Sequence, residues 1–444
     1  MNVDGRLDRI SAPFDAEFYL ELVRMLRMPW FQRAWVVQEV VVSSRATIFW
    51  GSSQYDWEEL TRALRFMSQQ EFPLVFIVTL QHISTIEEER KLYQRGGNST
   101  YGVLLRHQRC IATEQRDKVY SFCGLFESSS AVRISYRDDL AVVYREVAIQ
   151  ILHQNRSLDI LSRPPGSAKS SIKDLPSWVP DWSICPKPTF TYSWGHGTLS
   201  LAGTEATDAG QNSRFCTTLN STYSPKILSQ QNVLELEGYL FDTVVEVGPI
   251  FEGVQVPNSV RTAVSIARDW MKCGSTLLHA RKVFIAWQRL ANVHSKDPYI
   301  TNESIHEAFW QTVSTGELHS SPRVAIELNL WEKGSRFPFG LLHSAFTIAT
   351  HFFMNKPFML FEIQARCSLG RTMVRLRRGG LGLAAGETRV GDSVVLCRGS
   401  SVPLILRKRE DMRGMWRLIG DSYVHGIMKG EAWEENRCSR IVIV

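Results

Sequence analysis

The sequence predicts a multi-domain α/β protein with a small β-rich domain at its C-terminal end. The chain has 444 residues, more than one ordinary hydrophobic core holds. Helical periodicity and short strand patterns alternate along its first part, and short strands separated by glycine turns fill its last part. We therefore expect an α/β unit over 1–185, a loop and strand connector over 186–257, a mostly helical region over 258–357 and the β-rich domain over 358–444.

Apolar periodicity predicts the first elements of the N-terminal unit. A helix is expected over 15–28, and Pro29 then opens a second helix that ends near Ser43, because proline suits the first turn of a helix. The stretch "RATIFWG" (45–51) is typical of a short strand. The stretch "DWEELTRALRFM" (56–67) has the acidic first turn that helices favour.

Three further segments complete this unit. "RDKVYSFCGL" (116–125) predicts a short helix. "ISYRDDLAVVYREVAIQILHQ" (134–154) has the clearest helical signal, with apolar residues at i, i+3 and i+4 behind two aspartates. Its predicted buried face comprises Leu140, Val143, Tyr144, Val147, Ala148, Ile151 and Leu152. "LPSWVPDWS" (175–183) contains two prolines and cannot form a long helix, so it is expected to end the unit.

The second half of the chain changes pattern. "VLELEGYLFDTVVEVG" (233–248) alternates like a half-exposed strand, whereas 281–291 and 303–313 have helical spacing. The stretch 339–361 is the most apolar, but two histidines, an asparagine and a lysine interrupt it, so it favours a buried helix and strand over a membrane span. The arginines between 371 and 417 alternate with apolar residues and predict a solvated sheet face.

Composition narrows the class of protein. With 44% hydrophobic and 22% charged residues, the chain is globular, and a net charge of +6 makes nucleic-acid binding unlikely as a function. The eight cysteines form no C-x-x-C pair and no Cys/His cluster with zinc spacing, which indicates free thiols in a reducing compartment. Phosphate-loop, dinucleotide and zinc-protease motifs are absent from the sequence. We expect a soluble cytoplasmic protein without membrane association, metal or cofactor.

One charged residue stands out in the segment "FQRAWVVQEVVVS" (31–43). Glu39 lies among valines, and a carboxylate in such surroundings must find a partner, reach water or give up its charge. Glu39 also follows Trp35 by four residues, which places both side chains on one helical face. Ion pairing of Glu39 with Arg33 or Arg45 is one solution, and a functional carboxylate is the other.

Four segments together resemble fungal heterokaryon incompatibility (HET) domain proteins. They are, in the family's order, "FQRAWVVQEVVVS", "EQRDKVYSFCGL" (114–125), "LPSWVPDWS" and "GDSYVHGIMKGEAW" (420–433). The first matches the family through Arg33, Trp35, Gln38 and Glu39, and the second through Arg116, Asp117, Lys118, Val119 and Tyr120. The resemblance covers most of the chain, and it implies a HET domain over 1–185 that lacks the N-terminal part of the family's pattern.

This resemblance implies a partial flavodoxin-like fold, because the HET domain is regarded as a remote relative of the Toll/interleukin-1 receptor (TIR) domain. Some TIR domains cleave NAD with a glutamate four residues after a tryptophan. By this analogy Glu39 is the candidate catalytic residue, with Trp35 and Arg33 beside it. Arg116 and Asp117 are candidate supporting residues, although residues at the start of a helix more often form a cap and an ion pair.

The function implied by the resemblance is fungal non-self recognition with programmed cell death signalling. The expected partner is another incompatibility or receptor protein. Two alternatives remain open at this point. The chain is either a catalytically inert interaction or regulatory module, or a TIR-like NAD glycohydrolase that uses Glu39, so enzymatic activity is undecided.

Overall fold

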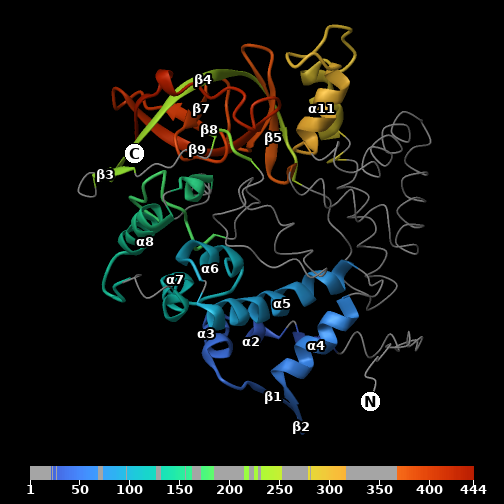
Figure 1. Cartoon of the computed structure of the whole chain (residues 1–444), viewed down its shortest axis with the longest axis vertical. Coiled ribbons are helices and arrows are strands. Elements are labelled where there is room, and N and C mark those ends of the chain that lie inside the picture. Colours follow the sequence, from blue (N-terminus) through green and yellow to red (C-terminus); the bar gives the residue numbers. More distant parts are fainter. Residues whose placement is uncertain are drawn as a thin grey trace, which may run out of the picture.

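The computed structural model shows a helical N-terminal region and a β-rich C-terminal region (Figure 1). The structure describes residues 22, 24–26, 28–68, 74–96, 98–126, 132–155, 157–162, 172–184, 215–219, 225–228, 232–252, 279–280, 282–316 and 368–444. The expected helix and strand over 339–361 lie outside these residues, as does most of the helix expected over 15–28.

The N-terminal region contains helices and one small sheet. In chain order its elements are α2 (Pro29–Gln32), α3 (Ala34–Val42), β1 (Thr47–Trp50), β2 (Ser53–Asp56), α4 (Trp57–Ser68), α5 (Leu74–Arg95), α6 (Thr100–Arg106), α7 (Asp117–Tyr120), η1 (Cys123–Leu125), α8 (Leu140–Asn155) and η2 (Asp159–Ser162). The strands β1 and β2 pair antiparallel. The prediction of a mixed α/β chain is confirmed, with a two-stranded sheet in the part of this region that the structure describes.

The helix expected from Pro29 to Ser43 is wrong in one respect, because two helices occupy this segment. Arg33 between them has an extended backbone, with φ −73° and ψ 137°. A parallel bridge to Ile111 explains the break: the Ala34 amide donates to the Ile111 carbonyl (2.9 Å), and the Ile111 amide donates to the Gln32 carbonyl (2.6 Å). These backbone groups are therefore unavailable for a continuous helical ladder.

The C-terminal region is built on an eight-stranded sheet. Its strands are β3 (Lys226–Leu228), β4 (Val233–Ile250), β5 (Arg371–Leu376), β6 (Leu381–Ala385), β7 (Ser393–Cys397), β8 (Leu404–Lys408), β9 (Met415–Val424) and β10 (Ser439–Ile443), with η4 at Glu435–Arg437. The strand order is β10-β4-β5-β6-β9-β8-β7, and β7 also pairs with β4, so the sheet closes on itself. Helix α11 (Ile305–Val313) and helical residues 282–291 confirm the two helices predicted there.

Strand β4 corrects the expected separation between connector and β-rich domain. The sequence pattern places β4 in the connector expected over 186–257. In the structure this strand of 18 residues pairs with β3, β5, β7 and β10. At Gly238 the approach to β7 is so close that a Cβ atom would lie 2.2 Å from the carbonyl oxygen of Leu396. Only glycine fits at this point of closure. A strand far away in sequence therefore completes the sheet.

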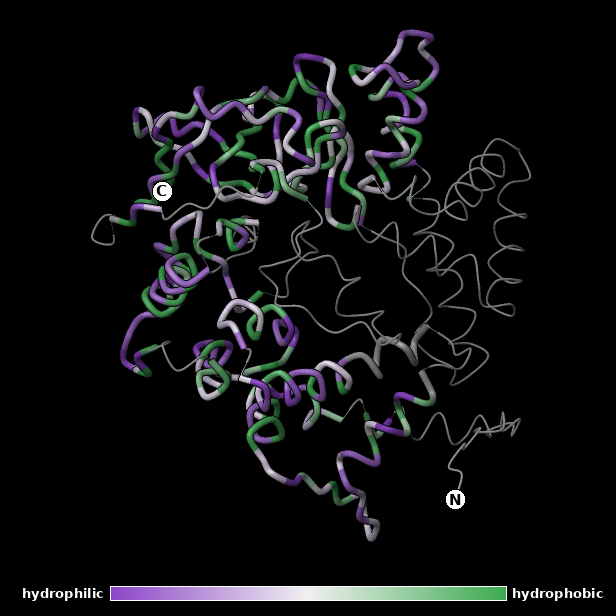
Figure 2. The backbone as a smooth tube through the Cα atoms, in the orientation of Figure 1, coloured by the Kyte–Doolittle hydropathy of each residue, from purple (hydrophilic) through white to green (hydrophobic). Residues whose placement is uncertain are grey.

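Three apolar clusters hold the fold together. One fills the inside of the closed sheet, for example with Val374, Leu396 and Ile405. A second joins β5 and β6 to α11 and to the helical residues 282–291. Hydrophobic and hydrophilic residues alternate in short runs along the sheet (Figure 2), as expected when successive side chains point to opposite faces.

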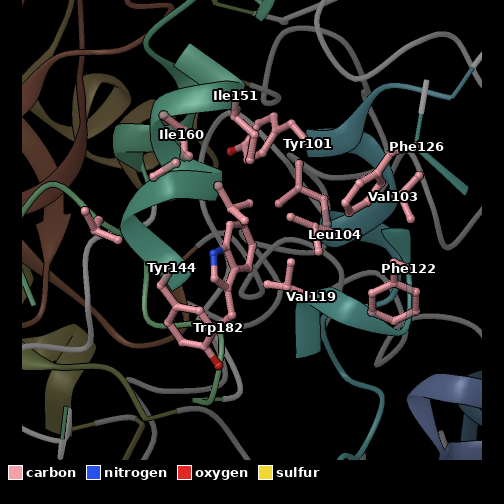
Figure 3. Packing of buried hydrophobic residues seen from close by; sticks show 14 of the residues in the cluster. Tyr101, Val103, Leu104, Val119, Phe122, Phe126, Tyr144, Ile151, Ile160 and Trp182 are labelled. Carbon is pink, nitrogen blue, oxygen red and sulfur yellow. The ribbon is translucent and has the colours of Figure 1, made fainter. Parts of the chain in front are cut away.

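The third cluster joins the helical region to the outer face of the sheet. It contains side chains from α3, α6, α7, α8 and the 172–184 segment, several of which are labelled in Figure 3. It also contains Leu404, Leu418 and Ile441 from the sheet. Helix α8 buries the face predicted from its periodicity, apart from the half-buried Leu140. Because one cluster crosses from helices to sheet, the two regions share a hydrophobic core.

Two further expectations can be compared with the structure. The solvated arginine face is wrong at Arg371, which is buried and forms an ion pair with Asp421 (2.8 Å). A buried guanidinium needs such a counter-charge. The five described cysteines are free thiols, as predicted. Among the helices that the structure describes, none combines the length and the apolar character needed to cross a membrane.

Candidate functional site

Residues of the first two family-like motifs meet at Asp117. The indole Nε1 of half-buried Trp35 donates to Oδ2 of Asp117 (3.0 Å), and the hydroxyl of exposed Tyr136 donates to Oδ1 (2.8 Å). We call these three residues the Asp117 node. Partial loss of hydration and then the bond to Asp117 raise the pKa of Tyr136 to about 12. Its hydroxyl therefore stays protonated at neutral pH and can donate.

A second contact joins the same motifs. The Gly124 amide donates to Oε1 of Gln38 (3.2 Å). A Cβ atom on residue 124 would lie 3.0 Å from the Gln38 side chain, so glycine is needed for this close approach. Trp35 and Gln38 of α3 are thus bonded to Asp117, the first residue of α7, and to Gly124 of η1.

Neighbouring bonds hold α7 in place. Tyr144 of α8 donates its hydroxyl to the Gln115 carbonyl (2.8 Å). The Lys118 ammonium donates to the carbonyls of Gln108 (3.3 Å) and Cys110 (2.6 Å). These bonds anchor the short helix that carries Asp117, so the carboxylate reaches Trp35 from a rigid support.

Glu39 and Arg33 point to solvent, and the expected ion pair of Glu39 is wrong. Glu39 makes no hydrogen bond or ion pair with any residue that the structure describes. Arg45 instead pairs with Asp56 (3.0 Å). Helix α3 turns Val36, Val37, Val40 and Val41 inward, and the helical period then leaves position 39 on the outside. Water solvates the Glu39 carboxylate, so no partner is required.

Arg116 and Asp117, the two candidate supporting residues, have different roles. Arg116 forms an ion pair with Glu114 (2.7 Å), as expected, and donates Nε to the Asp138 carbonyl (2.9 Å). Asp117 begins α7, yet its two oxygens accept from side chains rather than from the first-turn amides. The cap predicted for Asp117 is therefore wrong, because its carboxylate serves a tertiary contact. Asp117 contacts Trp35 on the Glu39 face of α3.

A buried ionic cluster escaped the sequence-based reasoning. Glu89 of α5 is fully buried and accepts from Arg106 Nε (2.7 Å) and from the His107 ring (2.9 Å). Burial alone would raise the pKa of Glu89, but the His107 bond and the Arg106 charge together lower it to about 2. Glu89 belongs to the charged run "IEEERK", which is typical of a solvated helix face. Its burial, and that of Arg90 beside it, is not visible in the sequence pattern.

The arrangement suits recognition better than metal chemistry. Within the part of the chain that the structure describes, no three His, Cys, Asp or Glu side chains gather in a way that could hold a metal ion. The outer face of α3 presents the Glu39 carboxylate, the guanidinium of Arg33 and part of the Trp35 ring. Exposed Tyr136 and Ile111 lie next to this face, through the Asp117 node and the bridge to Arg33. Tryptophan, tyrosine and arginine are the residues enriched at energetically important positions of protein interfaces.

Two comparisons with known proteins agree with this architecture. The family model of the Het-6 β-barrel domain matches residues 359–443. Heterokaryon incompatibility protein 6, OR allele, of Neurospora crassa is 25% identical over 370 aligned residues, which cover 72% of this chain. The chain is a distant homologue of this incompatibility protein. It spans about half the length of that relative, 49%. No solved structure matches the chain.

The Het-6 barrel match adds to the description of the closed sheet. Residues 359–443 include β5 to β10, whereas β3 and β4 precede them in sequence. The Het-6 barrel of this chain therefore takes its longest strand from outside the matched segment. The alignment with the incompatibility protein is much longer than the barrel, so the homology is not confined to it.

Proposed function

We propose that this chain is a HET-type incompatibility protein that takes part in fungal non-self recognition and programmed cell death signalling. The Asp117 node carries the proposal, because it joins the two motifs that resemble the HET family in one bonded unit. Homology to heterokaryon incompatibility protein 6 supports it independently. In this proposal the protein acts in the cytoplasm through another incompatibility or receptor protein.

The helical region is the acting unit in this proposal, and the Het-6 barrel regulates it. The outer face of α3 would contact the partner, since Arg33 and Glu39 are exposed and lack described partners there. Asp117 fixes the Trp35 ring in one orientation before binding, which reduces the entropy lost on association. Such a site needs no bound cofactor.

Expression in a panel of fungal strains that differ in incompatibility genotype tests the proposal. We expect reduced viability of fused cells with at least one tester strain. Asp117→Asn should weaken this effect, and the exposed α8 variant Glu146→Ala should not. Full viability with every tester, at protein levels matched by immunoblot, would contradict the proposed function.

NAD cleavage is a second candidate function, with a partial TIR-like fold as its premise. One observation favours it: Trp35 and Glu39 lie one turn apart on an outward helical face. Cleavage also requires groups that orient the ribose and exclude water. An exposed Glu39 without a described polar partner lacks this support, so the inert interaction module is the better reading of the site.

We expect no detectable NAD hydrolysis by the purified chain, and we expect any cellular effect to survive Glu39→Gln. Nicotinamide release can be measured by chromatography, with the folded state checked by circular dichroism. Turnover by the natural chain that disappears in Glu39→Gln would instead make the protein an enzyme with Glu39 as its catalytic residue.

A further inference from the structure

The segment 175–183, which we call the strap, is bonded to the Het-6 barrel on one side. Ser177 accepts from the Leu418 amide of β9 through Oγ (3.0 Å), and its own amide donates to the Val444 carbonyl (3.3 Å). The Ser177 hydroxyl also donates to that carbonyl. Trp178, fully buried, donates Nε1 to the carbonyl of Asn232, the residue before β4 (3.0 Å). The strap thus holds three separate parts of the barrel chain.

On its other side the strap packs against α8. Trp182 and Tyr144 lie close together in the shared core (Figure 3). Burial and then the charge of Asp181 raise the pKa of Tyr144. The Tyr144 hydroxyl donates to the Gln115 carbonyl (2.8 Å), and Gln115 lies two residues before Asp117.

Two prolines and one bonded turn restrict the backbone of the strap. Its two prolines, Pro176 and Pro180, restrict the backbone. Oδ1 of Asp181 accepts from both the amide (2.9 Å) and the hydroxyl (2.5 Å) of Ser183, which fixes the last turn.

We propose that the strap is a mechanical coupling between the Het-6 barrel and the Asp117 node. The connection runs from Leu418 and Val444 through Ser177 to Trp182, then through Tyr144 to Gln115 and the node. Loosening the strap at Ser177 would release α7 and, through Asp117, the Trp35 ring on the outer face of α3. A ligand or partner that pulls on β9 or β10 would thereby alter a surface in the helical region. The proposal depends only on these contacts and is independent of the proposed incompatibility function.

Hydrogen–deuterium exchange on the full chain tests the coupling. We expect Ser177→Ala to speed exchange at least about fivefold in the strap and also in 115–125, because the Ser177 hydroxyl makes two hydrogen bonds and the loss of one alone shifts a local opening equilibrium by about that factor. Ser368→Ala is the matched control. It removes one buried serine hydroxyl that bonds the Val313 carbonyl (3.2 Å), between the barrel and α11. The control should leave 115–125 unchanged.

Faster exchange confined to the strap in Ser177→Ala would overturn the proposal. Equal acceleration of 115–125 by Ser368→Ala would overturn it as well, because the effect would then be general destabilisation. If Ser177→Ala does not fold, Trp178→Phe replaces it, since this variant removes the indole bond to Asn232 while a smaller aromatic ring still fills most of the buried position.

Tyr144→Phe locates the coupling more narrowly. This variant cuts the bond to Gln115 without touching the barrel, so we expect faster exchange in 115–125 with an unchanged strap. In the double variant with Ser177→Ala, exchange in 115–125 should equal that of Tyr144→Phe alone, because both changes act on one connection. Additive acceleration in the double variant would contradict a route through Tyr144.

Discussion

At the scale of single residues, Glu39 and Glu89 show how position decides what a carboxylate does. Glu39 sits among valines in the sequence, yet the helical period turns it to water. Glu89 sits among charged residues, yet it is fully buried beside Arg106 and His107. Local composition suggests the opposite of what each side chain does. Of the two, Glu89 is the buried carboxylate, and its role is to hold α5 against α6.

The lowered pKa of Glu89 leads us to predict that folding stability depends on pH. Its pKa is about 2 in the folded chain against an ordinary 4.5. Because its pKa is lower in the folded chain than in the unfolded chain, the ionised Glu89 carboxylate stabilises the fold. This contribution is complete above about pH 4.5 and is lost as the pH falls toward about 2. The difference between these two pKa values corresponds to about 3 kcal/mol of folding stability at most. We expect Glu89→Gln to unfold at lower urea concentration than the natural chain, with the gap narrowing between about pH 4.5 and pH 2. A constant gap over this range would contradict the assignment.

We predict that replacing Asp117 with asparagine lowers the free energy of unfolding, because both carboxylate oxygens accept hydrogen bonds. Asparagine keeps one acceptor oxygen, so in Asp117→Asn the Tyr136 hydroxyl must turn and accept from the new amide if Trp35 keeps its bond, and both bonds lose the carboxylate charge. We expect a cost of about 1–3 kcal/mol in unfolding free energy. Tyr136→Phe, which removes a single exposed donor, should cost less. A thermal denaturation cycle with Asp117→Asn, Tyr136→Phe and the double variant measures the coupling, and strictly additive losses would show that the node is not one unit.

At the scale of elements, α8 is the helix that the sequence specifies best. Its buried residues follow from periodicity alone, since one face must meet the core whatever that core is. Helix α3 shows the opposite case. Its start at Ala34 depends on a backbone bridge to Ile111, and no local sequence pattern predicts this bridge. Elements set by their own residues are predictable, and elements set by a distant strand or bridge are not.

The buried face of α8 gives a stability prediction. Val147 is fully buried, so Val147→Asp places an unpaired charge in the shared core. We expect a loss of more than about 4 kcal/mol or failure to fold. Glu146→Ala, on the exposed face of the same helix, should change stability by less than about 0.5 kcal/mol. Chemical denaturation of both variants checks this, and near-natural stability of Val147→Asp would show that the face is placed wrongly.

At the scale of the whole molecule, the helical region and the Het-6 barrel share the largest apolar cluster. Because the core is shared, we expect the two regions to unfold together rather than as independent domains. The boundary expected at 358 therefore does not mark a unit of stability, because β4 enters the barrel from earlier in the chain. The third motif, with Ser177 and Trp178, lies at the junction of the two regions.

Leu418 on β9 tests this cooperativity. It is buried where the barrel faces the helical region, and Leu418→Ala should cost about 2–5 kcal/mol. We expect the far-ultraviolet helical signal and tryptophan fluorescence to melt in one transition and to shift to the same lower temperature. A helical signal that keeps its original midpoint in the variant would show that the two regions fold separately.

The sequence by itself determined several elements, among them α4, α8 and α11, the buried face of α8, the free thiols among the described cysteines and, through four ordered motifs, the resemblance to incompatibility proteins. These follow from local spacing and residue type, which act over a few turns of chain. Only the tertiary structure decided that Asp117 reaches Trp35, that β4 closes the barrel at Gly238 and that the Glu89 carboxylate is buried. Each of these joins residues from separate segments of the chain. Such contacts depend on how whole elements pack, and packing energy is shared among many side chains that no short stretch of sequence contains.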